Sequence, residues 1–305
     1  MIINILLLIL SILCLWYGAN YLVESASRVA VTLGISELVI GLTIVAFGTS
    51  APEFAVTISA AINGYADISV GNIVGSNNFN LGFILGSVAL IRHIQVSPKL
   101  VYRDGIFIIS VSLLLFLFFY DYKLTRWEGA VFVLLLIGYL LFLFFKKESI
   151  EEGVSHEKAG YRDIIILPVS ILTIIGGGLL LVHSATNIAR IIGISNWIIG
   201  VTIVAAGTSA PEMATSLVAA IRGRHGISAG NLIGSDLFNI LGVLGLAGII
   251  HPLSIETDAF KSLILLIGMV VLVVVFMRSG WKLTRKEGII LILIGVMRWL
   301  FDILQ

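Results

Sequence analysis

The hexapeptide GTSAPE occupies residues 48–53 and recurs without change at residues 207–212. Each copy lies inside a long apolar stretch, so each glutamate stands where a membrane helix would normally carry only apolar side chains. A charged side chain at the centre of a bilayer costs about 2.5–3.5 kcal/mol on insertion scales. Glu53 and Glu212 are therefore expected to face a cavity or a cation rather than lipid.

The two hexapeptides belong to a longer internal repeat. An offset of 159 positions aligns residues 36–80 with residues 195–239 without a gap, and more than half of the aligned positions are identical. The same offset pairs KLTRWEG at 123–129 with KLTRKEG at 282–288. We call residues 159 positions apart repeat partners. The repeat predicts one duplicated unit, with copies at 1–145 and 163–305 joined by a short charged linker at 146–162.

The composition indicates that the chain lies in a membrane. Hydrophobic residues make up 58% of it and charged residues 12%, whereas soluble domains are roughly half apolar and a quarter charged. The formal net charge is only +1 and no segment is rich in lysine and arginine, so no nucleic-acid partner is expected. The single cysteine excludes an internal disulfide and a multi-cysteine metal site.

A helix of about 20 mostly apolar residues crosses the hydrocarbon core of a bilayer. Polar and turn-forming residues divide the chain into about ten such helices, expected near 2–33, 37–63, 69–91, 101–120, 127–145, 163–192, 196–221, 228–250, 259–277 and 286–304. We therefore predict an all-α polytopic membrane protein. Because each unit has an odd number of helices, five, the second unit enters the membrane from the opposite side, which predicts two inverted five-helix repeats.

The distribution of basic residues predicts the topology, because cytoplasmic loops are enriched in lysine and arginine. Of the 19 lysines and arginines, most follow odd-numbered helices. The opposite side of the membrane, where the even-numbered helices end, carries only Lys123, Arg126, Arg190, Lys261 and Arg298. In a cell membrane, both termini are thus expected outside and the 146–162 linker in the cytoplasm.

The GTSAPE segments carry the residues of a cation site. Pro52 and Pro211 lack an N–H and disturb the preceding turn, which is expected to free carbonyls at 46–49 and 205–208. Freed carbonyls, threonine and serine hydroxyls and carboxylates are the hard oxygen ligands that calcium and sodium prefer. A glycine and proline kink alone is often only structural, but a matched pair of midplane glutamates is harder to explain by packing.

A second pair of motifs follows, GNIVGSNNFN at 71–80 and GNLIGSDLFN at 230–239. In each motif a serine and an asparagine stand four residues apart, so they share one helix face. Two glycines in each motif leave a small surface on which a neighbouring helix can pack closely. The four polar residues are Ser76, Asn80, Ser235 and Asn239, and the four glycines are Gly71, Gly75, Gly230 and Gly234.

Together these motifs resemble the sodium/calcium exchanger branch of the cation/calcium antiporter superfamily, of the prokaryotic type. The motifs G-T-S-x-P-E and G-N-x-x-G-S-x-x-x-N lie in both repeats, and the resemblance covers essentially the whole chain. It implies electrogenic exchange of sodium ions for a calcium ion by alternating access. It also implies that two long tilted helices, the first and the sixth, slide against a compact core formed by the other helices.

The resemblance further implies which residues bind the ions. The central calcium site would use the carboxylates of Glu53 and Glu212 and the carbonyls of Thr49 and Thr208. The flanking sodium sites would use Ala46, Ser50, Ser76, Ala205, Ser209 and Ser235. Asn80 and its repeat partner Asn239 would belong to the central polar cluster.

One difference from some relatives concerns potassium. Where this chain has Asn239, potassium-dependent exchangers have an aspartate that is tied to potassium, so potassium independence is expected here. Asp236 stands three residues earlier and roughly on the same helix face. Its repeat partner is the uncharged Asn77, and the sequence leaves open whether Asp236 is a ligand.

Other polar residues have structural interpretations. Thr125 with Glu128, and Thr284 with Glu287, fit the S/T-x-x-E capping box at a helix start. Glu24 and Arg28 are spaced for an i,i+4 ion pair near the end of the first helix, as a structural pair or as part of a gate.

The expected function is thus sodium/calcium antiport, with calcium and sodium as transported ions, the lipid bilayer as environment, no cofactor and a monomeric protein. A proton/calcium antiporter of the same superfamily is the nearest alternative, because protonation of the two glutamates could replace sodium binding. The hydroxyl-rich motifs favour sodium. A cation channel is a third possibility, since carboxylates also select cations in pores. No enzyme activity is expected, and no HExxH zinc motif is present.

Overall fold

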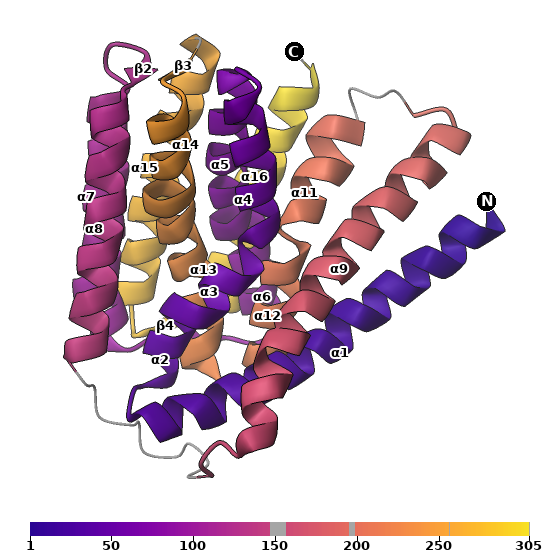
Figure 1. Ribbon diagram of the computed structural model, residues 1–305, viewed down its shortest axis with the longest axis vertical. Coiled ribbons are helices and arrows are strands. Elements are labelled where there is room, and N and C mark those ends of the chain that lie inside the picture. Colours follow the sequence, from indigo (N-terminus) through magenta and orange to yellow (C-terminus); the bar gives the residue numbers. More distant parts are fainter. Residues whose placement is uncertain (147–156, 195–198, 256, 305) are drawn as a thin grey trace.

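The computed structural model describes residues 1–146, 157–194, 199–255 and 257–304. Almost all of this part of the chain is helical (Figure 1). Several helices are continuous with short π-helical segments, which are named η here. The first half contains α1 (Ile2–Leu33), α2 (Glu37–Ile40), η1 (Gly41–Val45), α3 (Ala46–Thr49), α4 (Ala51–Ile62), α5 (Ala66–Phe79), η2 (Asn80–Ile84), α6 (Leu85–Ile91), β1 (Ile94–Gln95), η3 (Leu100–Gly105), α7 (Ile106–Phe118), β2 (Lys123–Leu124) and α8 (Arg126–Phe145). The second half contains α9 (Tyr161–Ile191), η4 (Gly200–Val204), α11 (Ala205–Thr208), α12 (Ala210–Ile221), α13 (His225–Leu237), η5 (Phe238–Leu244), α14 (Gly245–Ile250), β3 (Leu253–Ser254), α15 (Thr257–Arg278), β4 (Lys282–Leu283) and α16 (Arg285–Leu304).

Seven helical stretches in the described residues are long and apolar enough to cross a membrane, and a bent pair, Glu37–Thr49 with Ala51–Ile62, raises the number to eight. They coincide with eight of the ten predicted helices. The predicted helix 286–304 forms α16, which is not among these candidate spans. The predicted helix 196–221 and the predicted linker 146–162 are described only in part, because residues 195–198 and 147–156 lie outside the described residues.

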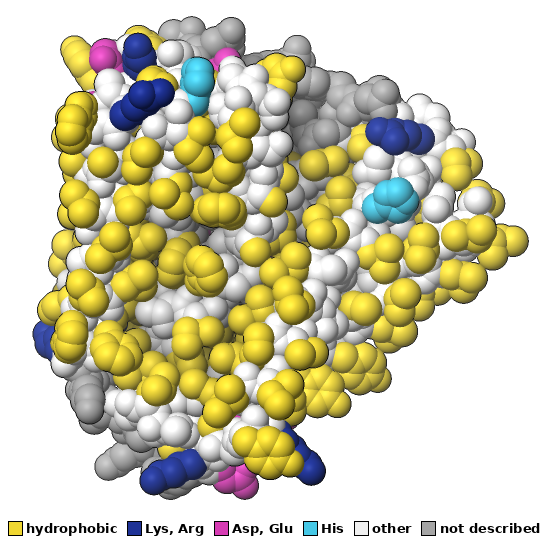
Figure 2. Space-filling view, viewed as in Figure 1, with side chains coloured by type: hydrophobic (Ala, Val, Ile, Leu, Met, Phe, Trp, Pro, Cys, Tyr) yellow, Lys and Arg dark blue, Asp and Glu magenta, His cyan; other side chains and the backbone are white. Residues whose placement is uncertain are grey.

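The outer surface has the character expected of a membrane protein. Figure 2 shows hydrophobic side chains over the middle of one face, with most lysine, arginine and acidic side chains near its upper and lower ends. Leucine, isoleucine and phenylalanine side chains of α1, α8 and α9 are exposed in large number. Exposed apolar patches of this extent are typical of a lipid-facing surface.

The two longest helices, α1 and α9, lie side by side and run obliquely to the rest of the bundle (Figure 1). Small residues allow their close approach. A Cβ atom added at Gly177 would lie 3.1 Å from the Cβ of Cys14, and one added at Gly18 would lie 2.7 Å from the Cγ1 of Ile174. Close crossing at small residues is common between membrane helices.

The GTSAPE segments break their helices as predicted. Ser50 leaves the helical region of backbone angles (φ −77°, ψ 6°), and α4 begins directly after it with Pro52 in its first turn. The helices before and after this break are bent by 51° relative to each other. Ser209 has nearly the same backbone angles (φ −88°, ψ 9°). Proline is accepted in a first turn because the N–H that it lacks would have no partner there.

Two short antiparallel sheets connect the halves of the chain. β1 pairs with β4, with Ile94 opposite Leu283, and β2 pairs with β3, with Leu124 opposite Leu253. Ile94 and Leu253 are repeat partners, and so are Leu124 and Leu283. In Figure 1 β2 and β3 lie at the upper end of the bundle and β4 lies near the lower end. Each sheet therefore joins one strand from each half of the chain.

Both predicted capping boxes are confirmed. The backbone N–H of Thr125 donates to Glu128 Oε2 at 2.7 Å, and the N–H of Glu128 donates to the Thr125 hydroxyl at 3.4 Å. Thr284 and Glu287 make the same two bonds at 2.7 and 3.4 Å. These glutamates satisfy the first N–H groups of α8 and α16 and take no part in the site described below.

The predicted close packing at the glycine motifs is found in the second repeat only. A Cβ atom added at Gly230 would lie 2.7 Å from the carbonyl oxygen of Leu38, so α13 contacts the backbone of α2 and η1 directly. In the first repeat, a Cβ atom added at Gly71 or Gly75 would meet no described atom within 4 Å. Gly71 is exposed and Gly75 half-buried. For these two glycines the predicted close packing is not found among the described residues; residues 195–198, which follow from the repeat as candidates for this contact, lie outside them.

Candidate cation-binding site

The broken helices bring the two glutamates together in the interior of the bundle. Both side chains are fully buried. The hydroxyl of Ser209 donates to Glu53 Oε1 at 2.9 Å, and the hydroxyl of Ser50 donates to Glu212 Oε1 at 3.2 Å. Each carboxylate is thus bound by the serine of the other GTSAPE segment, so the two halves of the chain share one polar centre.

Each carboxylate leaves its second oxygen without a donor. Glu53 Oε2 and Glu212 Oε2 are buried and have no hydrogen-bond partner. A buried charge without a partner is strongly unfavourable, and in known proteins such groups are paired or coordinate metal ions. The two carboxyl groups are also close enough to repel each other. A cation between or beside them would remove both penalties.

Serine and threonine hydroxyls surround this pair. Ser235 donates to Glu212 Oε1 at 3.4 Å, and its repeat partner Ser76 interacts with Glu53. The hydroxyl of Thr49 lies 3.3 Å from that of Ser235. The centre therefore offers hydroxyl oxygens next to carboxylate oxygens, which is a ligand set for a hard cation.

Two asparagines support the glutamates and were not predicted. Asn72 Nδ2 donates to the carbonyl of Glu53, and Asn231 Nδ2 donates to the carbonyl of Glu212, both at 3.4 Å. Asn231 Oδ1 also accepts from the hydroxyl of Thr49 at 3.0 Å. Their signal in the sequence is that both copies of the G-N-x-x-G-S motif place an asparagine four residues before the predicted serine.

The predicted carbonyl ligands are less free than expected. The carbonyl of Ala46 accepts from the N–H of Ser50 at 3.0 Å and from the hydroxyl of Thr49 at 3.3 Å. The carbonyl of Ala205 accepts from the hydroxyl of Thr208 at 3.2 Å. Ligation through Ala46 therefore requires a cation to displace the threonine hydroxyl. Of the twelve predicted site residues, all are buried except Ala205, which is half-buried.

Asn80 and Asn239 lie in a second buried cluster, together with Asn77 and Asp236. Asn80 Nδ2 donates to Asp236 Oδ1 at 3.0 Å, and Asn239 Nδ2 donates to Asn77 Oδ1 at 2.9 Å. The amide oxygens of Asn80 and Asn239 have no donor. This cluster contains oxygens available to a cation, as the first does.

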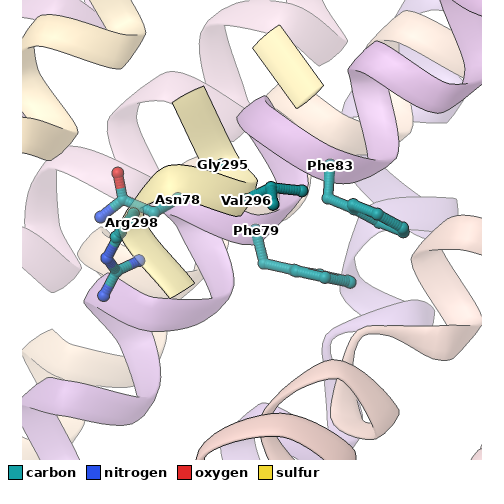
Figure 3. Close-up of a pocket in the computed structure, with 6 residues that line it drawn as sticks. All are labelled: Asn78, Phe79, Phe83, Gly295, Val296 and Arg298. Atoms are coloured by element: carbon teal, nitrogen blue, oxygen red, sulfur yellow. The ribbon is translucent and has the colours of Figure 1, made fainter. Parts of the chain in front are cut away.

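A cavity of about 210 Å³ reaches the site from one side. Ser50 is its polar member, and its other lining residues are apolar, including Phe47, Phe54 and Phe238. A second pocket, of about 20 Å³, lies between the end of α5 and α16 and contains none of the predicted site residues (Figure 3). The larger cavity is thus the one connected with the candidate ligands.

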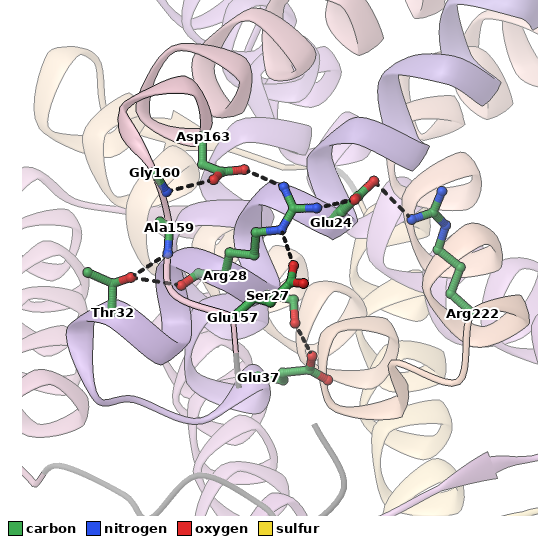
Figure 4. A network of polar contacts seen from close by, with 10 residues as sticks. All are labelled: Glu24, Ser27, Arg28, Thr32, Glu37, Glu157, Ala159, Gly160, Asp163 and Arg222. Carbon is green, nitrogen blue, oxygen red and sulfur yellow. Dashed lines mark hydrogen bonds and ion pairs between the residues drawn. The ribbon is translucent and has the colours of Figure 1, made fainter. Parts of the chain in front are cut away.

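An ion-pair network at one end of the bundle joins α1 to other elements (Figure 4). Arg28 pairs with Glu24 on the same helix, as predicted, and also with Asp163 of α9 at 2.9 Å and Glu157 at 3.6 Å. Glu24 in turn pairs with Arg222 at 3.4 Å, next to the end of α12. The network therefore connects the two long helices to each other and to the core.

Removal of the arginine at the centre of this network is expected to destabilise the protein. In Arg28→Gln the buried Asp163 loses its cation and keeps only neutral donors, the N–H of Gly160 and the hydroxyl of Ser25. We expect a loss of about 1–2 kcal/mol, below the value for a fully buried pair because Arg28 is partly exposed. Thermal unfolding in detergent would measure it as a lowered midpoint. Arg126→Gln, at an exposed arginine, is the control, and an equal midpoint in both variants would contradict the structural role.

Membrane-length helices, broken where two buried carboxylates meet, define a membrane cation transporter. A sequence model of the family described as "Sodium/calcium exchanger protein" matches residues 3–145 and 163–297. The chain therefore belongs to the sodium/calcium exchanger family, a family of transporters rather than enzymes.

Individual relatives agree with this assignment. The chain is 37% identical to the putative antiporter CaxA of Alkalimonas amylolytica, over 98% of each chain. It is 34% identical to the sodium/calcium exchanger MaX1 of Methanosarcina acetivorans, over 96% of this chain and 97% of the relative. Solved structures of the sodium-calcium exchanger NCX_Mj superpose on it with a TM-score of 0.87, at 29% identity and over 97% of each chain.

Proposed function

We propose that this protein is a secondary active antiporter that exchanges sodium ions for a calcium ion by alternating access. The observation that carries the proposal is the crossed pairing of Glu53 with Ser209 and of Glu212 with Ser50, which leaves one oxygen of each glutamate without a donor. Two carboxylates supply the two negative charges that balance one calcium ion. The relatives MaX1 and NCX_Mj, both named as sodium/calcium exchangers, support the choice of ions.

The proposed ligands follow the sequence prediction. Calcium is held by the carboxylates of Glu53 and Glu212 and by the carbonyls of Thr49 and Thr208. Sodium ions use the neighbouring hydroxyls and carbonyls and the two central asparagines. These residues are Ala46, Ser50, Ser76, Asn80, Ala205, Ser209, Ser235 and Asn239. Hydroxyls that line a carboxylate pair favour sodium over protons as counter-ion, because a proton needs no such ligands.

We further propose that the chain forms ten spans as two inverted repeats, 1–145 and 163–305. The strands β1 and β3 are repeat partners, and so are β2 and β4, so the repeat relates one sheet to the other. The two sheets lie at opposite ends of the bundle, which supports the inversion. The family model also matches the chain in two segments, one in each proposed repeat.

The proposed orientation in the cell membrane places both termini outside and the 146–162 linker in the cytoplasm. Figure 1 is compatible with it, since both chain ends lie towards the upper end and the start of α9 lies at the lower end. The end of α1 and the start of α9, which Arg28 and Asp163 of the network join, lie at that lower end, as a basic residue of a cytoplasmic side would. We propose a monomer as the working unit.

Alternating access is supported by the difference between the two glycine motifs. In the second repeat the face of Gly230 and Gly234 packs against α2 and η1, whereas in the first repeat the face of Gly71 and Gly75 meets no described atom within 4 Å. Two nearly identical motifs in opposite packing states are what a transporter with one closed and one open side requires. The reverse state closes the first face and opens the second.

Calcium uptake into sodium-loaded proteoliposomes tests the proposal. On dilution into sodium-free buffer, uptake of radioactive calcium should require internal sodium, should saturate and should not change with potassium. An interior-positive potential should speed uptake, because more positive charge leaves as sodium than enters as calcium. Uptake that ignores sodium and follows a pH gradient would instead indicate proton coupling. A flux that needs no counter-ion would indicate a channel.

A further inference from the structure

The buried carboxylates of this protein fall into two groups. Glu37, Asp104 and Asp163 each pair with an arginine, at 3.0, 2.6 and 2.9 Å. Glu53, Glu212 and Asp236 are fully buried and have no ion pair with any described residue. No lysine or arginine side chain is buried in the part of the chain that the structure describes. Asp236 therefore shares the property that distinguishes the two glutamates.

Several side-chain oxygens at and around Asp236 accept no hydrogen bond. Asp236 Oδ1 accepts from Asn80 Nδ2 at 3.0 Å, but its Oδ2 has no partner. Asn80 Oδ1 has none either. Asn239, whose Oδ1 is also without a donor, joins the same cluster through Asn77, which donates to the backbone carbonyl of Asp236 at 3.2 Å. The connected cluster thus contains three buried acceptor oxygens without a donor, which a positively charged ligand could bind.

Packing alone does not account for an aspartate at this position. The bond from Asn80 to Asp236 and the bond from Asn239 to Asn77 are related by the repeat, so an asparagine at 236 would accept the same bond. An asparagine would in addition bring an N–H₂ group, which Asp236 lacks. Aspartate instead adds a buried charge, and burying an unpaired charge costs several kcal/mol. Its presence is explained if a cation is bound there.

This cation is not the one held by both glutamates. Among the described residues, no group of three or more acidic, histidine or cysteine side chains converges on a single metal position. Asp236 nevertheless directly follows Ser235, whose hydroxyl donates to Glu212 Oε1 at 3.4 Å, so its charge interacts with that of Glu212. An ion bound by Asp236 thus lies beside the glutamate pair, in a separate but electrostatically linked position.

We propose that Asp236, with the amide oxygens of Asn80 and Asn239, binds a monovalent hard cation of the sodium class next to the Glu53–Glu212 pair. One carboxylate neutralises one monovalent ion, and amide and carboxylate oxygens are hard ligands. The inference rests on the proposed antiport function and adds a third carboxylate to it. Asp236 then determines the affinity for sodium, while the affinity for calcium depends mainly on the two glutamates.

The test is the variant Asp236→Asn, which recreates the side chain of the repeat partner Asn77 and keeps the bond from Asn80. We expect the half-saturating sodium concentration for calcium exchange to rise about tenfold or more, which corresponds to about 1.4 kcal/mol. The half-saturating calcium concentration should change less than about threefold. The double variant Asn77→Asp/Asp236→Asn returns a carboxylate to the cluster and should recover part of the sodium affinity.

A second measurement does not depend on transport. Sodium chloride should raise the thermal unfolding midpoint of the wild-type protein in detergent, since a ligand that binds only the folded state stabilises it. Asp236→Asn should need a higher sodium concentration for the same rise, whereas choline chloride should have no such effect on either protein. Asp236→Ser serves the same purpose if Asp236→Asn does not fold.

Three outcomes would overturn the inference. Unchanged sodium dependence in both assays would reduce Asp236 to a packing residue. An equal loss of sodium and calcium affinity would place it in the shared glutamate site. No recovery in the double variant would show that the carboxylate is not acting within this cluster. Failure of the antiport function itself is distinguishable, because wild-type vesicles would then show no sodium-driven uptake while the sodium-dependent stabilisation could still be measured.

Discussion

Replacement of Glu53 or Glu212 by glutamine is expected to reduce sodium-driven calcium uptake by at least about 100-fold. Glutamine has nearly the same shape and can accept the serine hydroxyl, so the crossed bonds at 2.9 and 3.2 Å can persist. What disappears is one of the two charges that face the calcium ion. Loss of one partner from a buried charge pair costs about 3–5 kcal/mol, and every 1.4 kcal/mol corresponds to about tenfold in affinity.

The measurement is radioactive calcium uptake by sodium-loaded proteoliposomes at equal protein content. Glu128→Gln and Glu287→Gln are matched controls, because these glutamates are also repeat partners but cap α8 and α16. Glutamine functions in a capping box, so both controls should transport near the wild-type rate. Uptake near wild type in Glu53→Gln or Glu212→Gln would refute the assignment of the site.

Enlargement of Gly234 is expected to have the second largest effect. A Cβ atom at this position would lie 2.8 Å from the Cα and carbonyl oxygen of Leu42 and from the Cβ of Ala46. Backbone atoms cannot rotate away, so Gly234→Leu must push α13 off η1. Overpacking of a well-packed interior costs about 1–3 kcal/mol, and a contact with backbone lies at the upper end of this range. We expect a lowered unfolding midpoint and a reduced yield of monodisperse protein in detergent.

The repeat partner Gly75 provides the comparison. A Cβ atom there meets no described atom within 4 Å, so Gly75→Leu should fold with a midpoint close to that of the wild type. If this face closes during the transport cycle, the same variant should slow calcium uptake by at least about tenfold, because the closed state becomes rare. Normal transport by Gly75→Leu would contradict the proposed closure, and equal destabilisation by both variants would contradict the observed difference in packing.

The features that were predicted correctly from the sequence depend on local chemistry. The breaks at Ser50 and Ser209 follow from the proline two residues later, and the capping boxes follow from the spacing of Thr125 and Glu128. The membrane class follows from composition and from the length of the apolar stretches. A buried glutamate pair was predictable because an isolated carboxylate in a bilayer needs a cation or a cavity.

The interactions between distant segments could not be predicted in the same way. Nothing in the sequence indicated that Ser209 would bind Glu53 while Ser50 binds Glu212, or that Arg28 would meet Asp163 of α9. Asn72 and Asn231 were missed because their role is to support the backbone of another helix. Such contacts depend on how the helices are placed relative to one another.

The sequence by itself thus determined a duplicated membrane protein with two helix breaks and a matched pair of buried glutamates. Only the tertiary structure decided which hydroxyl meets which carboxylate and that Asp236 lies in a cluster of acceptors without donors. It also decided that α13 packs against η1 at its glycines, whereas the glycines of α5 meet no described atom within 4 Å. The physical reason is that the two repeats have nearly the same local chemistry. Local chemistry cannot make nearly identical motifs differ, whereas the different neighbours that each motif meets in the bundle can.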